Sequence, residues 1–278
     1  MVTLPPEQPA PSGPPAPKER PQLHRARAMA ESFGVDPARY DSARPAYPDE
    51  LVERIVARQT DLRVLDVGCG TGIAARQFQA AGCSVLGVEP DERMAEYARK
   101  QGIDVEVATF EAWDPVGRTF DVVTAAQCWH WVDPTLGTTK AAEALRPGGR
   151  LAIFGHVFEP PLPIAHAFAA AYRRVVPDSP FNTQGRRPLD VYQAAYATIA
   201  DAVGSSDEFD HVERWRFDWT RSYERDQWLD LLPTTGGLTR LPADQKAEIL
   251  REVGEAIDAE GGTFTMEYVT LAATASRR

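Results

Sequence analysis

A glycine-rich turn lies between two apolar-rich segments in the sequence VLDVGCGTG, residues 64–72. The apolar residues before it favour a strand, and glycines let a ligand approach the backbone of the turn. A helix that begins after such a turn offers free N–H groups and the positive end of its dipole to an anion. Glu89 ends a second apolar segment 19 positions beyond Gly70, where a carboxylate can accept two hydrogen bonds from a ribose diol. The pattern predicts a nucleotide-type cofactor site.

The spacing of the glycines narrows the class of cofactor. A dinucleotide fingerprint that begins at Gly68 and Gly70 requires its third glycine at position 73, where this chain has Ile73 and places its glycine at Gly72 instead. The sequence also lacks the lysine-containing phosphate loop of nucleoside triphosphatases. We therefore expect a cofactor whose anionic group is a small carboxylate rather than a pyrophosphate.

Two histidines follow expected strands and are candidates for proton transfer. His130 lies in the sequence Trp129-His130-Trp131, where it would deprotonate an acceptor hydroxyl or orient a carboxylate. A hydrogen-bonded histidine in the wall of the site, without proton transfer, explains His130 equally well. His156 is expected to line the same pocket, with a structural role as the alternative.

Aromatic residues gather in the segments expected around the mouth of the site. They are Trp129, Trp131, Phe158, Phe168, Tyr172 and Phe181. This cluster favours an apolar or aromatic acceptor, although ordinary packing beneath a cap gives the same composition. No carboxylate cluster follows the fourth or fifth strand in the sequence, so we expect metal-independent catalysis.

Alternating strands and helices position these residues. We expect five strands, at residues 62–67, 84–88, 105–107, 121–126 and 150–155. One helix begins at Pro48, before the first strand, and the helices between the strands begin at about residues 73, 90 and 136. This alternation predicts an α/β fold with a doubly wound, mostly parallel sheet, because parallel strands need helical crossovers.

The regular alternation of strands and helices ends after residue 156. Two helical stretches, at 164–176 and 189–203, are interpreted as a helical cap inserted over the ligand site. Strands at 212–219 and 264–268, with a helix at 243–258 between them, extend the sheet at its edge. The domains expected are a disordered proline-rich tail at 1–22, a cofactor domain formed by 23–156 and 207–278 and beginning with a helix at 23–33, and a substrate cap at 157–206.

The composition is that of an ordinary globular protein. The 278 residues include 30 basic and 40 acidic ones, which give a net charge of −10 and a pI of about 5.1. Nucleic-acid-binding proteins usually carry a basic field, which this chain lacks overall. Three cysteines are too few for a disulfide framework, and no apolar run is long enough to span a membrane. We therefore expect a cytoplasmic protein with a small-molecule partner, no nucleic-acid or membrane partner, and an oligomeric state that the sequence does not indicate.

Four segments in register resemble the signatures of a known enzyme family. VLDVGCGTG, GVEPDERM, FDVVTAAQCWHWVDP and LRPGGRLAIFG are similar, in order and spacing, to those of class I S-adenosylmethionine-dependent methyltransferases, most closely the methyltransferase type 11 group. The resemblance covers about residues 61–156 and reaches more weakly to residues 40–48 and to the last strand. It implies a Rossmann-like sheet of seven strands and S-adenosyl-L-methionine as the cofactor.

The resemblance also implies roles for residues of the first two segments. Asp66, Gly68 and Gly70 would shape the pocket for the methionine part of the cofactor, with the backbone of Cys69 in contact. Glu89 would hold the ribose hydroxyls.

Further contacts to the adenine are implied beyond the second strand. Pro90 and Met94 would pack near the ring, and Thr109, Phe110 and Glu111 would flank it. The family more often has an aspartate at the position of Thr109, so the usual carboxylate contact to the adenine amino group is not carried over.

Three more residues complete the cofactor site that the resemblance implies. Gln127 would line the cofactor near its sulfur. Tyr40 and Arg44 lie in a segment that closes over the cofactor in relatives, where Arg44 would pair with the cofactor carboxylate.

The predicted function is the transfer of a methyl group to a small molecule by in-line displacement. The protein's main task is then to align two atoms and exclude water. We expect oxygen methylation ahead of nitrogen or carbon methylation, with His130 as a candidate base and with Trp129, Trp131, His156 and Phe158 around the acceptor. The alternatives are a non-catalytic protein that only binds the cofactor and a nicotinamide-dependent oxidoreductase, against which the glycine spacing argues.

Overall fold

The computed structural model of the chain describes residues 31–179 and 187–278. The expected tail at 1–22, residues 23–30 of the first expected helix, and Phe181 lie outside these ranges. Residues 31–33 of that helix begin a short 3-10 helix, η2 (Glu31–Val35).

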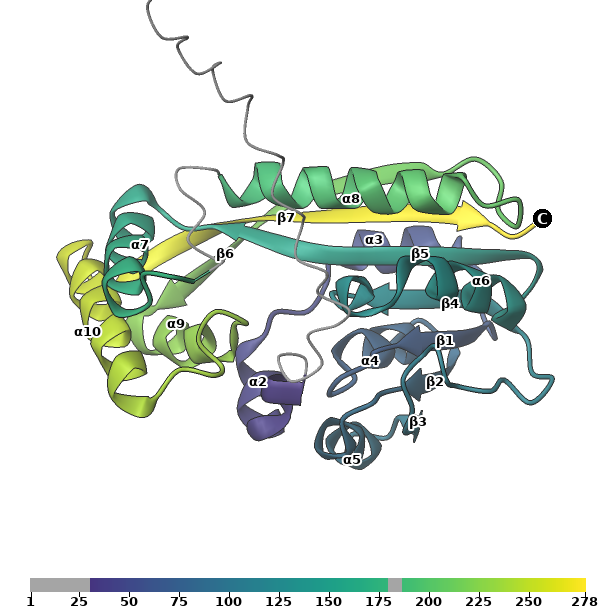
Figure 1. Cartoon of the computed structure of the whole chain (residues 1–278), viewed down its shortest axis with the longest axis horizontal. Helices are drawn as coiled ribbons and strands as arrows, with labels where there is room; N and C mark the ends of the chain where they lie inside the picture. The colour runs from purple at the N-terminus through teal and green to yellow at the C-terminus, as the bar shows by residue number, and fades with distance from the viewer. Residues whose placement is uncertain (1–30, 180–186) are drawn as a thin grey trace, which may run out of the picture.

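Seven strands form one sheet in the order β3-β2-β1-β4-β5-β7-β6 (Figure 1). They are β1 (Arg63–Val67), β2 (Ser84–Val88), β3 (Asp104–Glu106), β4 (Phe120–Ala126), β5 (Leu145–Glu159), β6 (Glu213–Glu224) and β7 (Thr263–Ser276). Strands β1 to β5 pair in parallel, and β7 lies antiparallel between β5 and β6. The predicted doubly wound, mostly parallel sheet of seven strands is confirmed.

Helices cover both faces of the parallel part of the sheet. One face packs against α3 (Asp49–Val56), α4 (Ile73–Ala80) and α5 (Glu92–Lys100), whose apolar residues recur at helical spacing. The other face packs against α6 (Pro134–Ala144) and α8 (Pro188–Gly204). Strands covered on both faces bury nearly every side chain, which explains their short, continuously apolar sequences.

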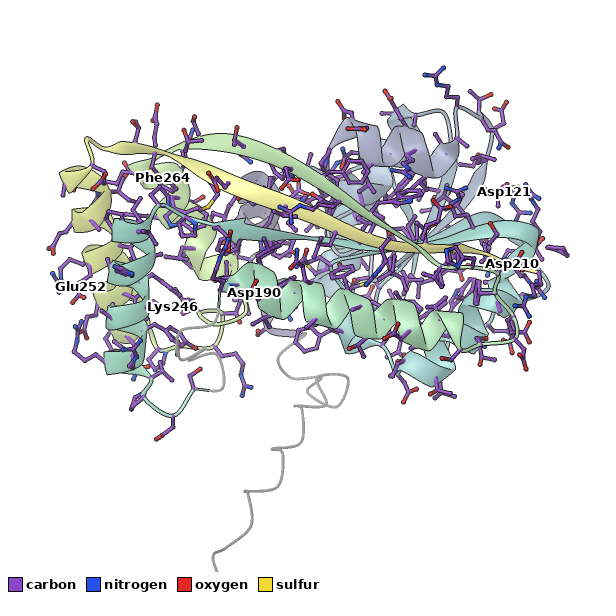
Figure 2. All side chains as sticks on the ribbon, turned by 90° about the horizontal axis from the view of Figure 1, so that it is seen from above. Asp121, Asp190, Asp210, Lys246, Glu252 and Phe264 are labelled. Carbon is purple, nitrogen blue, oxygen red and sulfur yellow. The ribbon has the colours of Figure 1, made fainter. Side chains whose placement is uncertain are left out.

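Strands β5, β6 and β7 are much longer than predicted and run beyond the parallel strands (Figure 2). The sequence signal for β7 is limited to residues 263–268, where exposed and buried residues alternate. Residues 269–275 are buried on both faces and mostly small, so the alternation disappears although the strand continues.

A second group of helices packs on the extended ends of these strands. It consists of α7 (Leu162–Val175), α9 (Arg225–Leu231) and α10 (Ala243–Ala259), with a core that includes Ile164, Trp228 and Ile249 (Figure 1). The short helix α2 (Pro37–Ala43) lies between this group and α5. Neither α2 nor α9 was predicted, because seven residues give too little periodicity to recognise a helix.

The segment expected as a cap, residues 157–206, does not form a separate unit. It begins inside β5, and α8 lies along β5 and β7 as one of the sheet's covering helices (Figure 2). Only α7 joins the second helical group, where it packs against α10. The structure over the strand ends is therefore assembled from several distant segments, because the long antiparallel strands provide the platform on which they pack.

Candidate active site

The glycine-rich turn connects β1 to α4 at the carboxyl edge of the sheet, beside the point where the strand order reverses between β1 and β4. Gly68, Gly70 and Gly72 all have positive φ angles, of 59°, 56° and 87°. A Cβ on Gly68 would lie 2.8 Å from the Cβ of Cys128, whereas one on Gly70 would meet nothing nearer than Met94 Cε at 4.0 Å. The turn thus packs closely against Cys128 at Gly68. It leaves open space above the backbone of Gly70, facing Met94, which we call the cradle.

Two buried carboxylates lie at this edge. Asp66 Oδ1 accepts the hydroxyl proton of Thr124 at 2.9 Å, while Oδ2 has no partner among the described residues. The two oxygens of Glu89 accept the backbone N–H groups of Gly70 and Asp91, each at 2.9 Å. Burial raises the pKa of Asp66 and of Glu89 to about 7. A ligand that brings positive charge would stabilise both carboxylates in their ionised form.

The loops that follow β3 and β4 are tied to each other. The carboxylate of Glu111 accepts the backbone N–H of Asp133 at 2.8 Å, at the start of α6. Phe110 and Trp129 are buried, with ring centroids 6.3 Å apart, and present almost no surface to a ligand. Thr109 keeps part of its surface exposed. Of these residues, Thr109 is therefore better placed than Phe110 or Trp129 to touch a ligand.

The short 3-10 helix η3 (Trp129–Trp131) follows β4. His130 is exposed on it, and its ring centroid lies 4.6 Å from that of Trp131. Trp131 in turn lies 6.3 Å from Phe33 of η2. His130 has no hydrogen-bond partner in the described part of the chain, so its imidazole remains available to a ligand.

Gln127 occupies the position immediately after β4 with a φ of 59°, a conformation that non-glycine residues rarely adopt. Its side-chain Oε1 accepts the backbone N–H of His156 at 2.6 Å, and its Nε2 donates to the His156 carbonyl at 3.2 Å. The amide therefore takes the place of the next residue of β4 in pairing with β5. A Cβ at Gly155 would lie 2.5 Å from Gln127 Oε1, so this clamp requires a glycine there.

His156 lies inside a network of aromatic and polar side chains on one face of β5. Its Nδ1 is 2.9 Å from Thr270 Oγ1, which also accepts the indole N–H of Trp219 at 2.9 Å. Because an indole only donates, the hydroxyl proton of Thr270 remains to be donated to His156 Nδ1. This assigns the imidazole proton to Nε2, which is buried and has no partner among the described residues.

The imidazole of His156 is neutral over the physiological range. Burial, together with the positive charge of Arg44, lowers its pKa to about 3. The ring of Tyr47 stacks on it with a centroid distance of 4.2 Å. His156 therefore presents a fixed hydrogen-bond donor rather than a cation or a proton acceptor.

Helix α2 bridges the two groups of helices. Asp41 forms an ion pair with Arg76 of α4 at 2.8 Å, and Arg39 forms one with Asp230 of α9 at 2.8 Å. The segment predicted to close over the cofactor is thus fixed on both sides in this structure.

Tyr40 and Arg44 belong to this bridge. The Arg44 guanidinium donates to the Thr234 hydroxyl at 3.0 Å and to the Thr234 carbonyl at 2.6 Å, and lies 4.9 Å from the centroid of the Tyr40 ring. No carboxylate pairs with Arg44 among the described residues. Its charge is therefore free to meet an anion.

Several residues of the site were not singled out by the sequence. Tyr47 lies in the segment of residues 40–48 that resembles the family, which was a usable signal. Trp219 was assigned to a strand but not to the site, and Thr270 lies beyond the strand that was predicted. Only the pairing of β6 with β7 places Trp219 opposite Tyr268 and close to Thr270.

Two kinds of feature are absent from residues 31–179 and 187–278. No three His, Cys, Asp or Glu side chains come together there in a way that would hold a metal ion. None of the helices in these ranges is both long and apolar enough to cross a membrane.

Comparisons with known proteins add a family and three similar proteins. A family described as a methyltransferase domain matches residues 40–254. An uncharacterized methyltransferase of Mycobacterium tuberculosis is 26% identical over 264 residues, which cover 90% of this chain and 97% of that protein. A ubiquinone biosynthesis O-methyltransferase of Rhizobium etli is 34% identical over 126 residues, 43% of this chain and 44% of that protein. A solved structure from Anaeromyxobacter dehalogenans, of a protein proposed to be a type II methyltransferase, matches 84% of this chain and 97% of that one with a TM-score of 0.62 and 22% identity, and shares the fold.

Proposed function

Because the chain belongs to the class I S-adenosylmethionine-dependent methyltransferases, the family matched by residues 40–254, we propose that it methylates an oxygen atom of a small-molecule acceptor. The observation that supports this function best is the open cradle over Gly70 between two buried carboxylates. The methyl acceptor would approach the cofactor from the side of β4 and β5, where Gln127 and His156 lie.

The polar groups at the turn fit S-adenosylmethionine. Asp66 Oδ2 and Thr71 Oγ1 are buried and lack a partner in the described part of the chain, so polar groups of a ligand would satisfy them. Each oxygen of Glu89 holds one backbone N–H and keeps a lone pair for a ribose hydroxyl. The cofactor contacts that we propose are Tyr40, Asp66, Gly68, Cys69, Gly70, Glu89, Pro90, Met94, Thr109, Glu111 and Gln127. The buried Phe110 would support the adenine side by packing.

When bound, the cofactor supplies a methyl group on a sulfonium that is already activated. The chain's own residues hold the reactants in line and exclude water. Gln127 and His156, near the carboxyl ends of β4 and β5, would hold the acceptor oxygen in line with the methyl group that the cofactor supplies. A hydroxyl acceptor would lose its proton to His130 or to water, and a carboxylate needs no base.

Oxygen as the methylated atom is supported by the relative from Rhizobium etli, whose name describes an O-methyltransferase. The chain spans less than half of that protein, so nitrogen and carbon methylation remain the alternatives. The net charge of −10 favours a small molecule over a nucleic acid, and three free cysteines are in keeping with the cytoplasm.

Calorimetric titration tests the cofactor site. We expect S-adenosylmethionine and S-adenosylhomocysteine to bind and NAD to give no signal. Glu89→Ala should weaken both adenosyl ligands about tenfold or more, because the ribose loses its acceptor. Glu92→Ala, an exposed carboxylate on α5, is the matched control and should leave the affinity unchanged. Binding of NAD alone would overturn the proposal.

A methyl-transfer assay distinguishes an enzyme from a protein that only binds the cofactor. Methyl-labelled S-adenosylmethionine is incubated with a panel of hydroxyl, carboxylate and amine acceptors, and the labelled products are identified. Labelled ethers or esters are the expected result. Tight cofactor binding without turnover on the whole panel would favour the non-catalytic alternative.

A further inference from the structure

Aromatic rings and positive charge surround the side chain of His156. The charge of Arg44 acts on His156 and on the hydroxyls of Tyr192, Tyr223 and Tyr268. Arg221 acts on the two latter tyrosines as well, so the main permanent charges that act on these four groups are those of two arginines. This side of the site therefore favours an anion, although the chain as a whole is acidic.

Arg44, which follows the last residue of α2 as its C-cap, differs from Arg39 within the helix. Arg39 is neutralised by Asp230, whereas Arg44, half-buried against the ring of Tyr40, bonds only to the neutral hydroxyl and carbonyl of Thr234. A partly buried guanidinium without a counter-ion gains more from an anionic ligand than a solvated one does. His156 Nε2–H adds a second, neutral donor, which makes no well-formed hydrogen bond among the described residues although the backbone of Ala46 lies close to the ring. Two donors with one positive charge match a carboxylate better than a phosphate dianion.

An enclosed apolar cavity of about 60 Å³ lies farther along the same face of β5. Its lining includes Phe158, Ile164, Phe168, Trp228 and Leu232. His156 and Phe158 are two residues apart on the strand, so their side chains point to the same face. The Tyr268 ring lies between them, with its centroid 5.8 Å from that of His156 and 6.2 Å from that of Phe158. His156 and the lining of the cavity are thus linked by consecutive aromatic contacts through Tyr268 and Phe158.

We propose that the acceptor is an organic carboxylate with a short apolar arm, whose carboxylate binds between Arg44 and the Nε2–H of His156 and whose arm extends toward the cavity beside Phe158. This inference rests on the proposed function and names the substrate class for the same site. It also assigns Arg44 to the acceptor rather than to the carboxylate of the cofactor. A carboxylate head explains why Arg44 has no protein counter-ion, and an apolar arm explains the cavity.

Binding of probe molecules to the full chain, saturated with S-adenosylhomocysteine, tests the assignment. The probes are trans-cinnamate, its neutral amide cinnamamide, and acetate, which lacks the arm. We expect cinnamate to bind about tenfold or more tightly than either of the others. Equal affinities for cinnamate and cinnamamide, or the absence of cinnamate binding, would overturn the proposal.

Substitution of Arg44 distinguishes a role in binding the acceptor from a role in binding the cofactor. Arg44→Gln should weaken cinnamate about tenfold and leave cinnamamide and S-adenosylhomocysteine within about twofold of the wild type. Arg251→Gln, which removes an exposed arginine of α10 together with its surface ion pairs, is the control and should change neither ligand. Loss of S-adenosylhomocysteine affinity in Arg44→Gln would instead place Arg44 at the cofactor.

The arm of the acceptor is tested by filling the cavity. Ile164→Phe adds volume to its lining and should weaken cinnamate and cinnamamide alike, with S-adenosylhomocysteine binding retained as a check on folding. Unchanged affinity for both probes would contradict the placement of the arm. If wild-type protein failed to bind S-adenosylhomocysteine at all, the proposed function itself would fail, an outcome distinct from each of those above.

Discussion

The two sides of the site differ in the chemical groups that they present to a ligand. The edge at β1 and β2 presents backbone N–H groups, glycines, and the carboxylates of Asp66 and Glu89. The extended part of β5, β6 and β7 presents aromatic rings, Arg44, and the N–H of a neutral His156. Negative charge on the first side suits a cationic sulfonium, and positive charge on the second suits the anionic acceptor proposed above. In that proposal, the two reactants would bind to regions of opposite charge.

The two sides also differ in how the chain builds them. The cofactor side comes mostly from one turn and the end of the neighbouring strand, whose parallel pairing with β1 fixes Glu89 close to Gly70. The acceptor side joins residues from α2, β5, β6 and β7, which are far apart in the sequence. Substitutions on the first side should therefore act mainly on cofactor affinity, and those on the second on stability and acceptor binding.

The largest effect is expected for Gly70→Val. The φ of 56° imposes strain on any side chain, and the new methyl groups would occupy the cradle. We expect cofactor affinity to fall about a hundredfold or more, as measured by calorimetry. Gly102→Val is the matched control, because it carries similar strain at a φ of 86° in open space. If both variants bound the cofactor equally well, the cradle would have no role in binding.

The next largest effect concerns pH. Folded Asp66 releases its proton near pH 7, whereas the unfolded chain releases it near 3.8, so the folded state holds more protons between these values. Its contribution therefore makes the free energy of unfolding fall as pH rises from about 4 to 7. Asp66→Asn keeps an acceptor for the Thr124 hydroxyl and should flatten this slope, with the part due to Glu89 remaining.

Urea unfolding at pH 5, 6, 7 and 8 measures this difference between wild type and Asp66→Asn. The stability of the variant relative to the wild type should rise through the series. Parallel stability curves for the two proteins would show that Asp66 does not titrate in this range.

A smaller effect is expected on the acceptor side. Thr270→Val removes the hydroxyl that joins the Trp219 indole to His156, leaving buried polar atoms without partners. The cost is about 1–3 kcal/mol of unfolding free energy, with cofactor affinity unchanged. Thr265→Val, at an exposed position of the same strand, should be close to neutral. A large loss of cofactor affinity in Thr270→Val would show that the two sides are not independent.

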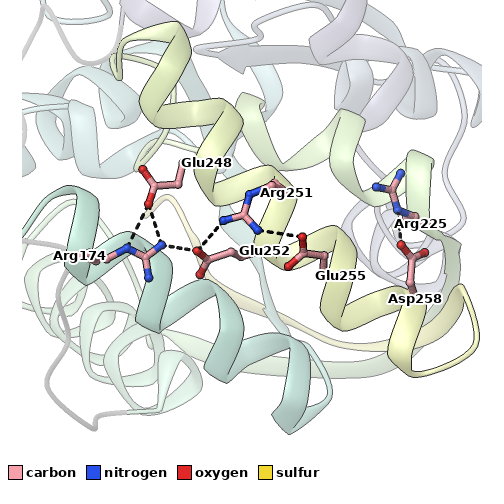
Figure 3. Close-up of polar contacts among 7 residues, drawn as sticks. All are labelled: Arg174, Arg225, Glu248, Arg251, Glu252, Glu255 and Asp258. Atoms are coloured by element: carbon pink, nitrogen blue, oxygen red, sulfur yellow. Dashed lines mark hydrogen bonds and ion pairs between the residues drawn. The ribbon is translucent and has the colours of Figure 1, made fainter.

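The smallest effect is expected at the surface ion pairs of α10 (Figure 3). Arg251 contacts Glu252 and Glu255, and Arg174 of α7 contacts Glu248 and Glu252. These groups are solvated and screened by salt, so Arg251→Gln should produce no change that thermal unfolding resolves. A clear destabilisation that disappears at high salt would show that the ion pairs of Arg251 stabilise α10.

The residues that the sequence identified most directly are those whose role is local. An apolar strand, a turn of alternating glycines and a helix define the position of Asp66 and Gly70 from neighbouring residues alone. Glu89 follows from the next strand, because parallel strands end at the same edge of a sheet. Gln127 was predicted near the cofactor, but its amide clamp on His156 required the β4–β5 register to be known.

The sequence by itself determined the succession of strands and helices along the parallel part of the sheet, because hydrophobic period and turn chemistry act over a few residues. The class of cofactor came from the resemblance of four sequence segments to a known family. Only the tertiary structure decided the length of β5 to β7, the place of α8 and the surroundings of His156. Thr270 and Trp219 are 51 residues apart, and Thr270 and His156 are 114 apart. Their contact depends on strand register, which many weak side-chain contacts set together and no local pattern encodes.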